Sequence, residues 1–396
     1  MKDFSRPVIL TFINNYLPGY KAGGIPRSMI NAVENLSDYV DFRIVTRDRD
    51  LGDTKPYSTI NYDQWQPVGS ASVFYLSPAT SSFRHIKNLI SDSYHDVLYL
   101  NSFFDTFTIK VLLIRKFGGI TFKPVIVAPR GEFSSAALKL KFIRKFIFIR
   151  LVRLTGLYYN VTWHASSELE ERDIKRCMKI KNSSIHNAMD LPTRAVLNDS
   201  NVHDTKASDF FEGLKMVFVS RISRVKNLEY ALQILSKVTA KVLFDIYGPL
   251  EDLKYWKECQ GIIDGLPANV KVNYMGIVNP SQVVQIFSYY DLFLFPSGGE
   301  NYGHVIAESL TSGTPVLISN KTPWKNLQDE NLGWDISLDQ MDRFVEIIEY
   351  YARISPGERS QKRRSIKGKI EGYLLDPAVL EANRQLFLSR VPVNLI

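Results

Sequence analysis

Short apolar runs recur along the chain, and each is followed by a polar or glycine-containing loop and then by residues at helical spacing. Runs rich in β-branched and aromatic residues predict buried strands. These runs are Pro7–Ile13, Asp41–Thr46, Asp96–Leu100, Val125–Ala128, Tyr158–Trp163, Met216–Ser220, Val242–Tyr247, Val270–Met275, Leu292–Phe295 and Val316–Ile318. Because strands and helices alternate throughout, we expect an α/β fold with parallel sheets.

The most informative stretch runs from Asp291 to Ser319. Its first strand stops at Pro296–Gly299, a helix is predicted over Tyr302–Thr311, and Gly313 with Pro315 ends that helix. The unpaired N–H groups at a helix start and the positive end of its dipole favour an anion. The glycine-rich turn therefore predicts a phosphate-binding position.

Two carboxylates occupy the same stretch, Glu300 in the turn and Glu308 eight residues later. That spacing is about two helical turns, so we expect both on nearly one helix face. Carboxylates repel phosphates but accept hydrogen bonds from hydroxyls, a combination that suits a nucleotide sugar. The alternative is that Glu300 is an acid favoured by the helix dipole and Glu308 a solvated helix residue.

A second loop, Arg221–Asn227, follows the strand Met216–Ser220 and carries two candidate phosphate ligands, Arg221 and Lys226. Arginine offers planar, bidentate contacts to phosphate oxygens, and lysine offers a mobile point charge. An exposed basic loop is the alternative. Gly248 and Gly276 follow the next two strands, where we expect backbone groups to line a pocket for a base.

A glycine-rich loop also follows the first predicted strand. Gly19, Gly23 and Gly24 let the backbone pass close to a ligand at the strand end, and a helix is predicted over Met29–Leu36. Arg27, near the start of that helix, is a candidate for contact with donor phosphates or with an acceptor.

Further acceptor candidates follow two later strands of the first half. Arg130 and Glu132 lie directly after Val125–Ala128, and the alternative there is a tight turn stabilised by their own pairing. His164 ends another strand and can bond a ligand, although a structural role is an equal alternative. Ser166 or Ser167 is expected to cap the helix that follows.

The pair Asp48 and Asp50 has the spacing of a D-x-D metal motif. Arg47 and Arg49 are interleaved with these acids, so a salt-bridged loop is the favoured interpretation. We expect no bound metal and no other cofactor.

With 396 residues, 45% of them hydrophobic and 23% charged, the chain fits two globular domains. The boundaries are predicted as a first domain 1–190, a breaker-rich linker 191–213, a second domain 214–376 and a final helix 377–396. Cys177 and Cys259 form no disulfide or zinc motif. The N-terminus lacks a signal-like apolar region and no run of eighteen apolar residues occurs, which favours a cytoplasmic protein.

Positive charge is concentrated between Lys110 and Arg153, where eleven basic residues accompany one acid, Glu132, although the whole chain carries +8. Within it, Leu138–Arg153 interleaves cations with Phe, Ile and Leu, as expected of a helix at an anionic membrane surface. Its cations fall on two sides of a helix, so a buried helix with basic flanks is the alternative. No nucleic-acid-binding pattern accompanies the charge.

The stretch Ser297–Glu308 resembles a known motif, S-x-x-E-x-[FY]-G-x-x-x-x-E, and G-x-P-V follows from Gly313. This is the E-x7-E signature of retaining family-four (group 1) glycosyltransferases of GT-B fold. Arg221–Asn227 is similar to the family's R-x-x-x-x-K-[NG], and His164–Glu170 to its H-x-T-S-x-x-E. Ile185–Asp190 resembles P-N-G-x-D with alanine in place of glycine.

One departure concerns the loop after Val125–Ala128. Many relatives have a histidine there, whereas this chain reads PRGEF and looks like a subset with S-P-R-G. The resemblance therefore leaves open whether a histidine takes part in the chemistry.

The resemblance implies two Rossmann-like domains facing each other across a cleft, the first binding an acceptor and the second a nucleoside diphosphate sugar. It implies that Arg221, Lys226 and the amides around Asn301, Tyr302 and Gly303 stabilise the leaving diphosphate. Glu300 would then hold sugar hydroxyls and Glu308 the ribose diol, without a metal. The final helix is expected to cross back to the first domain.

For the reaction, the resemblance implies transfer to an acceptor hydroxyl with retention of configuration. We expect attack on the leaving-group face, because no carboxylate is obviously placed for double displacement. The basic first domain suggests a lipid-linked glycan acceptor in O-antigen or other polysaccharide synthesis, with the protein peripheral on the inner membrane face. The alternatives are a non-catalytic nucleotide-sugar-binding or membrane scaffold and a nucleotide-sugar epimerase.

Overall fold

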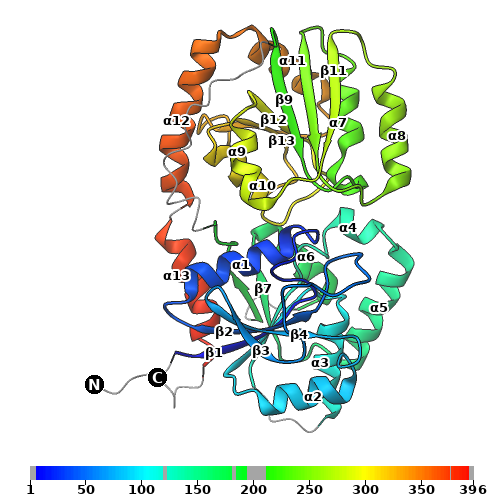
Figure 1. Ribbon diagram of the computed structural model, residues 1–396, viewed down its shortest axis with the longest axis vertical. Helices are drawn as coiled ribbons and strands as arrows, with labels where there is room; N and C mark the ends of the chain where they lie inside the picture. The colour runs from blue at the N-terminus through cyan, green and yellow to red at the C-terminus, as the bar shows by residue number, and fades with distance from the viewer. Residues whose placement is uncertain (1–5, 119–122, 181–183, 194–210, 375, 392–396) are drawn as a thin grey trace. The chain divides into compact units, whose positions relative to one another are not determined.

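The computed structural model describes residues 6–118, 123–180, 184–193, 211–374 and 376–391. The chain divides into two compact units, residues 1–194 with 376–396 (unit 1) and residues 195–375 (unit 2). Each unit contains one mainly parallel sheet with helices packed on it (Figure 1). The predicted α/β class with two parallel-sheet domains is therefore confirmed. Most of the predicted linker, residues 194–210, lies outside the described residues.

The described part of unit 1 builds an eight-stranded sheet. All neighbouring strands are parallel except the edge pair β3 and β4. The strands in sheet order are β3 (Trp65–Val68), β4 (Ala71–Leu76), β2 (Asp41–Arg47), β1 (Val8–Phe12), β5 (Val97–Asn101), β6 (Val125–Ala128), β7 (Thr162–Ala165) and β8 (Ile185–Asn187).

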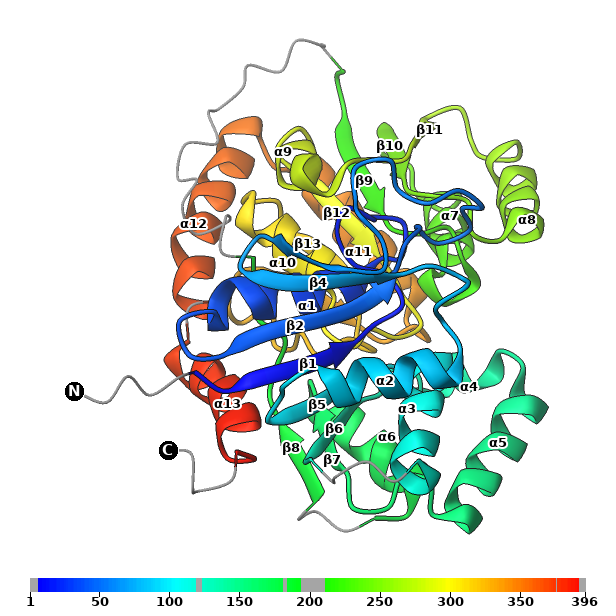
Figure 2. The ribbon, with the colours of Figure 1, turned by 60° about the horizontal axis from the view of Figure 1, so that its bottom comes forward.

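Helices cover both faces of this sheet because its central strands are apolar on both sides (Figure 2). On β1, Leu10 and Phe12 pack in one buried cluster with side chains of α2, α3, α5 and α6, whereas Ile9 packs in the other with α1 and α13. The helices are α1 (Gly24–Leu36), α2 (Phe83–Asp92), α3 (Thr106–Phe117), α4 (Ser135–Lys139), α5 (Phe142–Thr155), α6 (Glu168–Met178) and α13 (Pro377–Leu388).

The last of these helices, α13, belongs to unit 1 although it follows unit 2 in the sequence. The ring of Phe387 packs edge-on against Phe42 and Tyr99 in the core of unit 1. Asn383 Nδ2 donates a hydrogen bond of 2.8 Å to the carbonyl of Met189. The final helix is thus fixed to the first domain by apolar burial and by backbone contacts.

In unit 2, six strands of the described region form a fully parallel sheet. Their sheet order is β11 (Val270–Gly276), β10 (Val242–Tyr247), β9 (Leu214–Val219), β12 (Leu292–Phe295), β13 (Val316–Ser319) and β14 (Gly333–Ile336). The chain moves outward from β9 to β11 and then returns to place β12 on the other side of β9. This reversal is a topological switch point, where ligands bind outside the carboxyl ends of the strands in open α/β sheets.

The helices of unit 2 follow its strands in the right order for parallel connections. They are η3 (Arg224–Lys226), α7 (Leu228–Leu235), α8 (Leu253–Ile263), η4 (Pro280–Gln282), α9 (Val283–Phe287), α10 (His304–Thr311), α11 (Met341–Arg353) and α12 (Pro356–Leu374). Among the described residues, no helix has both the length and the apolar character needed to cross a membrane.

Three predicted elements differ most from the structure. The helix expected from Met29 begins at Gly24. The strand expected over Tyr158–Trp163 begins only at Thr162, because the ring of Tyr158 packs on Phe103 instead. The single helix expected over Leu138–Arg153 is two helices, α4 and α5, because Leu140 is extended and Lys141 has a left-handed backbone at φ 56°.

Candidate functional site

The loops that carry the predicted phosphate ligands lie next to each other because β9 and β12 are paired strands. Met216 is in register with Leu292 and Val217 with Phe293. The two strands are parallel, so their carboxyl ends meet at the same edge of the sheet. The loop after β9 carries Arg221 and Lys226, and the loop after β12 carries Glu300.

Hydrogen bonds hold these two loops together. The amide of Gly298 donates to the carbonyl of Val225 at 2.7 Å, and Asn227 Nδ2 donates to the carbonyl of Pro296 at 2.9 Å. Asn227 has a left-handed backbone at φ 61°, which asparagine tolerates well. The position of one loop therefore fixes the position of the other.

Lys226 and Glu300 form an ion pair at this junction. Lys226 Nζ lies 2.7 Å from Glu300 Oε1 and 2.9 Å from Oε2. Ser297 Oγ donates to Glu300 Oε1 at 2.6 Å. The side chains of Lys226 and Glu300 are 16% and 9% exposed, so the pair is sheltered but still reached by solvent.

The helix α10 starts immediately after this pair. Its N-cap is Gly303, which has φ 82° and no side chain to cap the first turn. A Cβ at this position would lie 2.9 Å from Ile306 Cδ1, and a left-handed backbone disfavours any L side chain. The amides at the start of α10 and the positive end of its dipole thus stand beside a cation and an acid.

Glu300 precedes the helix instead of lying on it, because α10 begins at His304. The prediction that Glu300 and Glu308 share a helix face was therefore wrong. Glu308 lies in the second turn of α10 and is half-buried. Tyr302 is buried, with its ring near Trp324 and its carbonyl accepting the Trp324 indole N–H at 2.7 Å, while Asn301 beside it is half-buried.

The other predicted cation, Arg221, has a different partner. Its Nη1 lies 2.8 Å from Glu251 Oε2 in the loop after β10, and both side chains are substantially exposed. Of the two predicted cations, Lys226 is the one that pairs with Glu300. Arg221 remains at the same sheet edge, since it follows β9, and its surface pair is readily exchanged for another partner.

The predicted base-pocket glycines differ in what surrounds them. Gly248 packs so tightly that a Cβ would lie 1.8 Å from the carbonyl oxygen of Ser220, and its amide donates to the carbonyl of Gly276 at 2.8 Å. A Cβ at Gly276, in contrast, would meet nothing within 4 Å. Gly248 therefore holds neighbouring loops together, and a base-binding role for either residue stays a prediction.

In unit 1, Arg130 is buried in a hydrogen-bonded network. Its guanidinium donates to Asp190 Oδ1 at 2.6 Å, to Asn101 Oδ1 at 3.0 Å and to the Tyr99 hydroxyl at 2.8 Å. The side chains of Arg130 and Asp190 are only 4% and 6% exposed. Ser28 Oγ of α1 also donates to Asp190 Oδ2 at 2.6 Å.

Glu132 likewise serves the interior of unit 1. It accepts hydrogen bonds from Ser102 Oγ at 2.7 Å and from the amides of Phe103 and Phe104 at 2.6 and 3.1 Å. Burial raises the pKa of its carboxyl, while these donors act to lower the same pKa. The alternative of a turn stabilised by pairing between Arg130 and Glu132 is wrong, because each has other partners.

His164 completes the network as a neutral ring. Its Nε2 faces the carbonyl of Ala188 at 2.8 Å, an acceptor, so Nε2 carries the proton and Nδ1 accepts from the Tyr99 hydroxyl at 2.7 Å. Burial, followed by the charge of Arg130, lowers the pKa of His164 to about 4. The positions of Arg130, Glu132 and His164 indicate roles in supporting unit 1 and do not support direct contact with an acceptor.

The remaining predicted residues of unit 1 lie near its glycine-rich loop. Gly24 is exposed at the first residue of α1, and Arg27 lies half-buried in the next turn of that helix. Asp48 pairs with Arg49 at 2.7 Å, and Asp50 accepts from the amide of Tyr20 at 2.8 Å. The salt-bridged interpretation of the D-x-D loop is therefore confirmed.

Three residues that contact the predicted site residues were not themselves predicted. Ser297 contacts Glu300, Glu251 pairs with Arg221, and Asp190 anchors Arg130. Ser297 is the serine of the S-x-x-E motif, and Asp190 is the aspartate of the stretch that resembles P-N-G-x-D. These two motif positions could have identified both residues from the sequence. No cluster of three His, Cys, Asp or Glu side chains suited to a metal occurs within the described ranges.

Comparison with known proteins gives a family match and partial relatives. Residues 205–367 match the family described as glycosyl transferases group 1. An uncharacterised glycosyltransferase of Methanocaldococcus jannaschii is 29% identical over 113 residues, which are 26% of this chain and 27% of that protein. An uncharacterised 41.2 kDa protein in the cps region of Klebsiella pneumoniae is 22% identical over 292 residues, covering 69% of this chain and 74% of that protein. The chain thus spans only about a quarter of the first of these relatives.

Solved structures share the fold over nearly the whole chain. Anabaena HepE in complex with UDP and glucose has a TM-score of 0.66 at 14% identity, covering 96% of this chain and 98% of that chain. WaaG, a glycosyltransferase involved in lipopolysaccharide biosynthesis, has a TM-score of 0.65 at 12% identity, covering 96% and 99%. The fold is GT-B, and together with the match over residues 205–367 it supports a glycosyltransferase of group 1.

Proposed function

We propose that the protein transfers a glycosyl group from a nucleoside diphosphate sugar to an acceptor hydroxyl, with retention of anomeric configuration. The observation that carries this proposal is the pairing of Lys226 with Glu300 at the switch point of unit 2, beside the start of α10. At this edge of the sheet, the cation and the helix start can bind the diphosphate of such a donor, and the carboxylate can bind its sugar hydroxyls. The UDP and glucose bound by the structurally similar HepE agree with this donor class.

In this proposal the bound donor replaces the contact between Lys226 and Glu300 by contacts of its own with each of the two side chains. Lys226 moves its charge from Glu300 to the diphosphate, and the first amides of α10 face the phosphate oxygens. Glu300, still held by Ser297, accepts hydrogen bonds from sugar hydroxyls. Arg221 can leave its surface pair with Glu251 to add a second cation, and Glu308 is proposed to bind the ribose diol.

The chemical demand on the site is the negative charge that builds on the leaving diphosphate. The bond between the anomeric carbon and the diphosphate oxygen breaks, and its electron pair goes to the diphosphate. The acceptor oxygen bonds to the anomeric carbon on the same face, and its proton passes to a departing phosphate oxygen. Preorganised donors aimed at such charge contribute about 10²–10³-fold each, so the mechanism requires no metal.

The acceptor in this proposal is a lipid-linked or other glycan used in polysaccharide synthesis, O-antigen included. The relative in the Klebsiella pneumoniae cps region and the lipopolysaccharide role of WaaG support this class. We assign acceptor binding to unit 1, with Arg27 of α1 as the position to test first, while Gly24 stays a candidate for contact with the donor. The expected location is the cytoplasmic face of a membrane that carries the acceptor.

The test is Glu300→Gln, assayed for transfer and donor hydrolysis against a panel of nucleoside diphosphate sugars. Because the amide cannot replace the carboxylate towards Lys226 and the sugar, we expect activity to fall at least about 100-fold. Glu346→Gln, which removes an exposed acid paired with Arg343 in the same unit, is the matched control and should keep full activity.

Activity of Glu300→Gln within about threefold of the unmodified protein would overturn the site. Donor binding by the unmodified protein without transfer to any acceptor would favour the non-catalytic alternative. Release of an epimerised nucleotide sugar would favour the epimerase.

A further inference from the structure

The helix α5 of unit 1 exposes a large apolar surface. Ile143 is 71% exposed and Leu154 is 84% exposed. We define the outer face of α5 as the six exposed apolar side chains of this helix, which are Phe142, Ile143, Phe146, Ile147, Leu151 and Leu154. Single exposed apolar residues are common, but a contiguous group of this size marks an interaction surface.

These side chains gather on one side of the helix because the opposite side is buried. Phe148, Ile149 and Val152 pack in the core of unit 1 with α3 and α6. At about 100° per residue, the six residues of the outer face fall within a sector of about 180°. A helix that covers a protein core in water normally has polar residues on its outer side. The apolar outer face of α5 is therefore suited to a second apolar environment, in addition to the core of unit 1.

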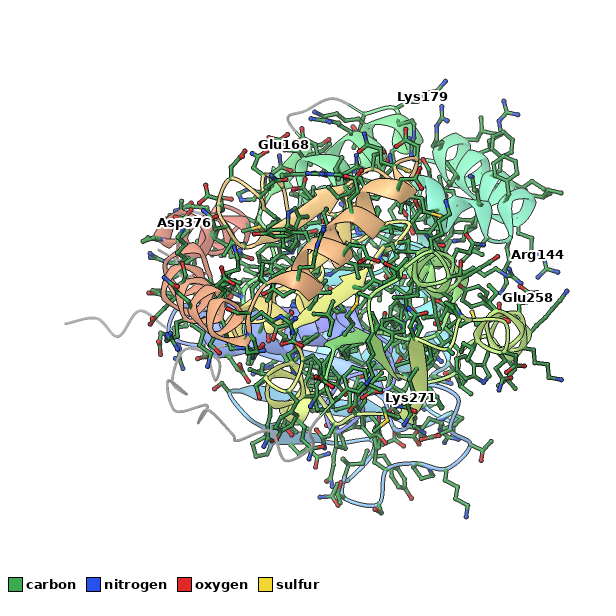
Figure 3. All side chains as sticks on the ribbon, turned by 90° about the horizontal axis from the view of Figure 1, so that it is seen from above. Arg144, Glu168, Lys179, Glu258, Lys271 and Asp376 are labelled. Carbon is green, nitrogen blue, oxygen red and sulfur yellow. The ribbon has the colours of Figure 1, made fainter. Side chains whose placement is uncertain are left out.

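Two arginines lie within the same exposed sector, Arg150 and Arg153, and Arg144 lies at its edge. Arg144, Arg150 and Arg153 are all exposed, and Arg144 points outward from the ribbon (Figure 3). Lys139 and Lys141 add exposed cations just before the helix. No acid occurs anywhere between residues 133 and 167. The buried-helix alternative is thus not what the structure shows, since half of α5 faces outward.

This mixture of apolar and cationic side chains selects one kind of partner. A protein partner that covered this face would bury at least three arginines and would have to supply an acid for each. At a membrane surface, in contrast, apolar side chains enter the acyl boundary while arginines extend to anionic headgroups. We propose that the outer face of α5 docks on the surface of a membrane that contains anionic lipid.

The surface continues at the C-terminal end of α5. Arg115 at the end of α3 donates to the carbonyls of Tyr159 and Asn160 at 3.1 and 3.0 Å, and Lys116 donates to the carbonyl of Thr155. These contacts join two segments that each expose an aromatic ring, Phe117 at 75% and Tyr159 at 81%. Tyrosine is enriched at the membrane interface, and phenylalanine is common on the apolar face of interfacial helices.

This inference goes beyond glycosyl transfer and does not depend on it. It concerns contact between the bilayer and α5, whereas the proposed donor site lies in unit 2 and the proposed acceptor position lies on α1. An enzyme held on the surface would meet a lipid-linked acceptor in two dimensions. Glu300→Gln should bind membranes as the unmodified protein does, so the two proposals can fail separately.

The experiment is sedimentation of the full chain with vesicles of phosphatidylcholine containing 30% phosphatidylglycerol, compared with pure phosphatidylcholine. We expect binding to the anionic vesicles that weakens with added salt. Arg144→Gln with Arg150→Gln should weaken binding about 30-fold, at about fivefold per cation. Ile143→Ser with Leu154→Ser should weaken it at least about tenfold through lost apolar burial.

Matched controls lie on α8 of unit 2, where Leu253, Lys254 and Lys257 are exposed. Leu253→Ser, and Lys254→Gln with Lys257→Gln, should bind vesicles unchanged. Circular dichroism would verify that all variants fold, which is expected because every changed side chain is exposed.

Three outcomes would overturn the proposal. These are absence of vesicle binding, equal binding to neutral and anionic vesicles, and α5 variants that bind like the α8 controls. A dimer in light scattering without lipid, lost in Ile143→Ser with Leu154→Ser, would instead assign this face to a second copy of the chain.

Discussion

Two ion pairs of this protein stand at corresponding places, yet their surroundings differ. Arg130 and Asp190 follow strands β6 and β8 of unit 1, and Lys226 and Glu300 lie in the loops after β9 and β12 of unit 2. The first pair is 4% and 6% exposed, and it shares hydrogen bonds with Asn101, Tyr99 and Ser28. The second is 16% and 9% exposed beside the uncapped start of a helix.

The difference shows how charge at the end of a parallel strand can serve structure or ligand binding. The guanidinium of Arg130 donates its hydrogen bonds to residues inside unit 1, so a ligand could bind it only by breaking those hydrogen bonds. Among the described residues Lys226 has one charged partner, Glu300, and that partner can itself accept from a sugar. The free energy of unfolding of suitable variants tests this contrast.

The largest loss of stability is expected from Arg130→Met. Removing one partner of a buried ion pair leaves the other charge unpaired, which costs about 3–5 kcal/mol. Urea unfolding of the full chain should show this loss. Adding Asp190→Leu to the same variant should recover part of it, and a single variant as stable as the unmodified protein would show that the pair is not structural.

A pH-dependent loss is expected from His164. Its pKa is about 4 in the folded chain against the ordinary 6.5, so the unfolded chain takes up the proton first as the pH falls. Stability from the neutral ring is therefore complete above pH 6.5 and is lost towards pH 4, a change of about 3 kcal/mol.

The control for this titration is His164→Gln, which keeps a donor for the Ala188 carbonyl but cannot titrate. Burial also raises the pKa values of Glu132 and Glu170, so only the difference between the protein and the variant isolates the imidazole. The stability advantage of the unmodified protein should shrink between pH 7 and pH 4. Parallel stability profiles would contradict a buried neutral His164.

The smallest change in stability is expected from Lys226→Met, at about 1–3 kcal/mol, because Ser297 and some solvent still reach the Glu300 carboxylate that loses its cation. Its effect on transfer should be large, with kcat/KM at least about 100-fold lower, since the leaving diphosphate loses its nearest cation. Steady-state kinetics and urea unfolding of the same preparation test both parts. A large loss of stability with normal kinetics would make Lys226 a structural residue like Arg130.

Much of the fold could be read from local patterns. Val125–Ala128, Val242–Tyr247 and Leu292–Phe295 were predicted at their observed bounds, because a buried parallel strand is a continuous apolar run. The strands β3, β4, β8 and β14 were missed. Burial alternates along the first part of β4, and the other three strands are short and mostly half-buried or exposed, so none of them forms a long buried apolar run. The break at Lys141 was missed because no glycine or proline marks it.

The sequence by itself determined the alternation of strands and helices, the glycine-rich turn before α10 and the identity of Lys226 and Glu300 as charged residues in strand-end loops. Only the tertiary structure decided that these two side chains meet across 74 residues, that Arg221 turns to Glu251, and that Arg130 is sealed against Asp190. The physical reason is that periodicity and turn chemistry act over a few residues. Partner choice, in contrast, depends on which strands become neighbours and on how much water remains beside them.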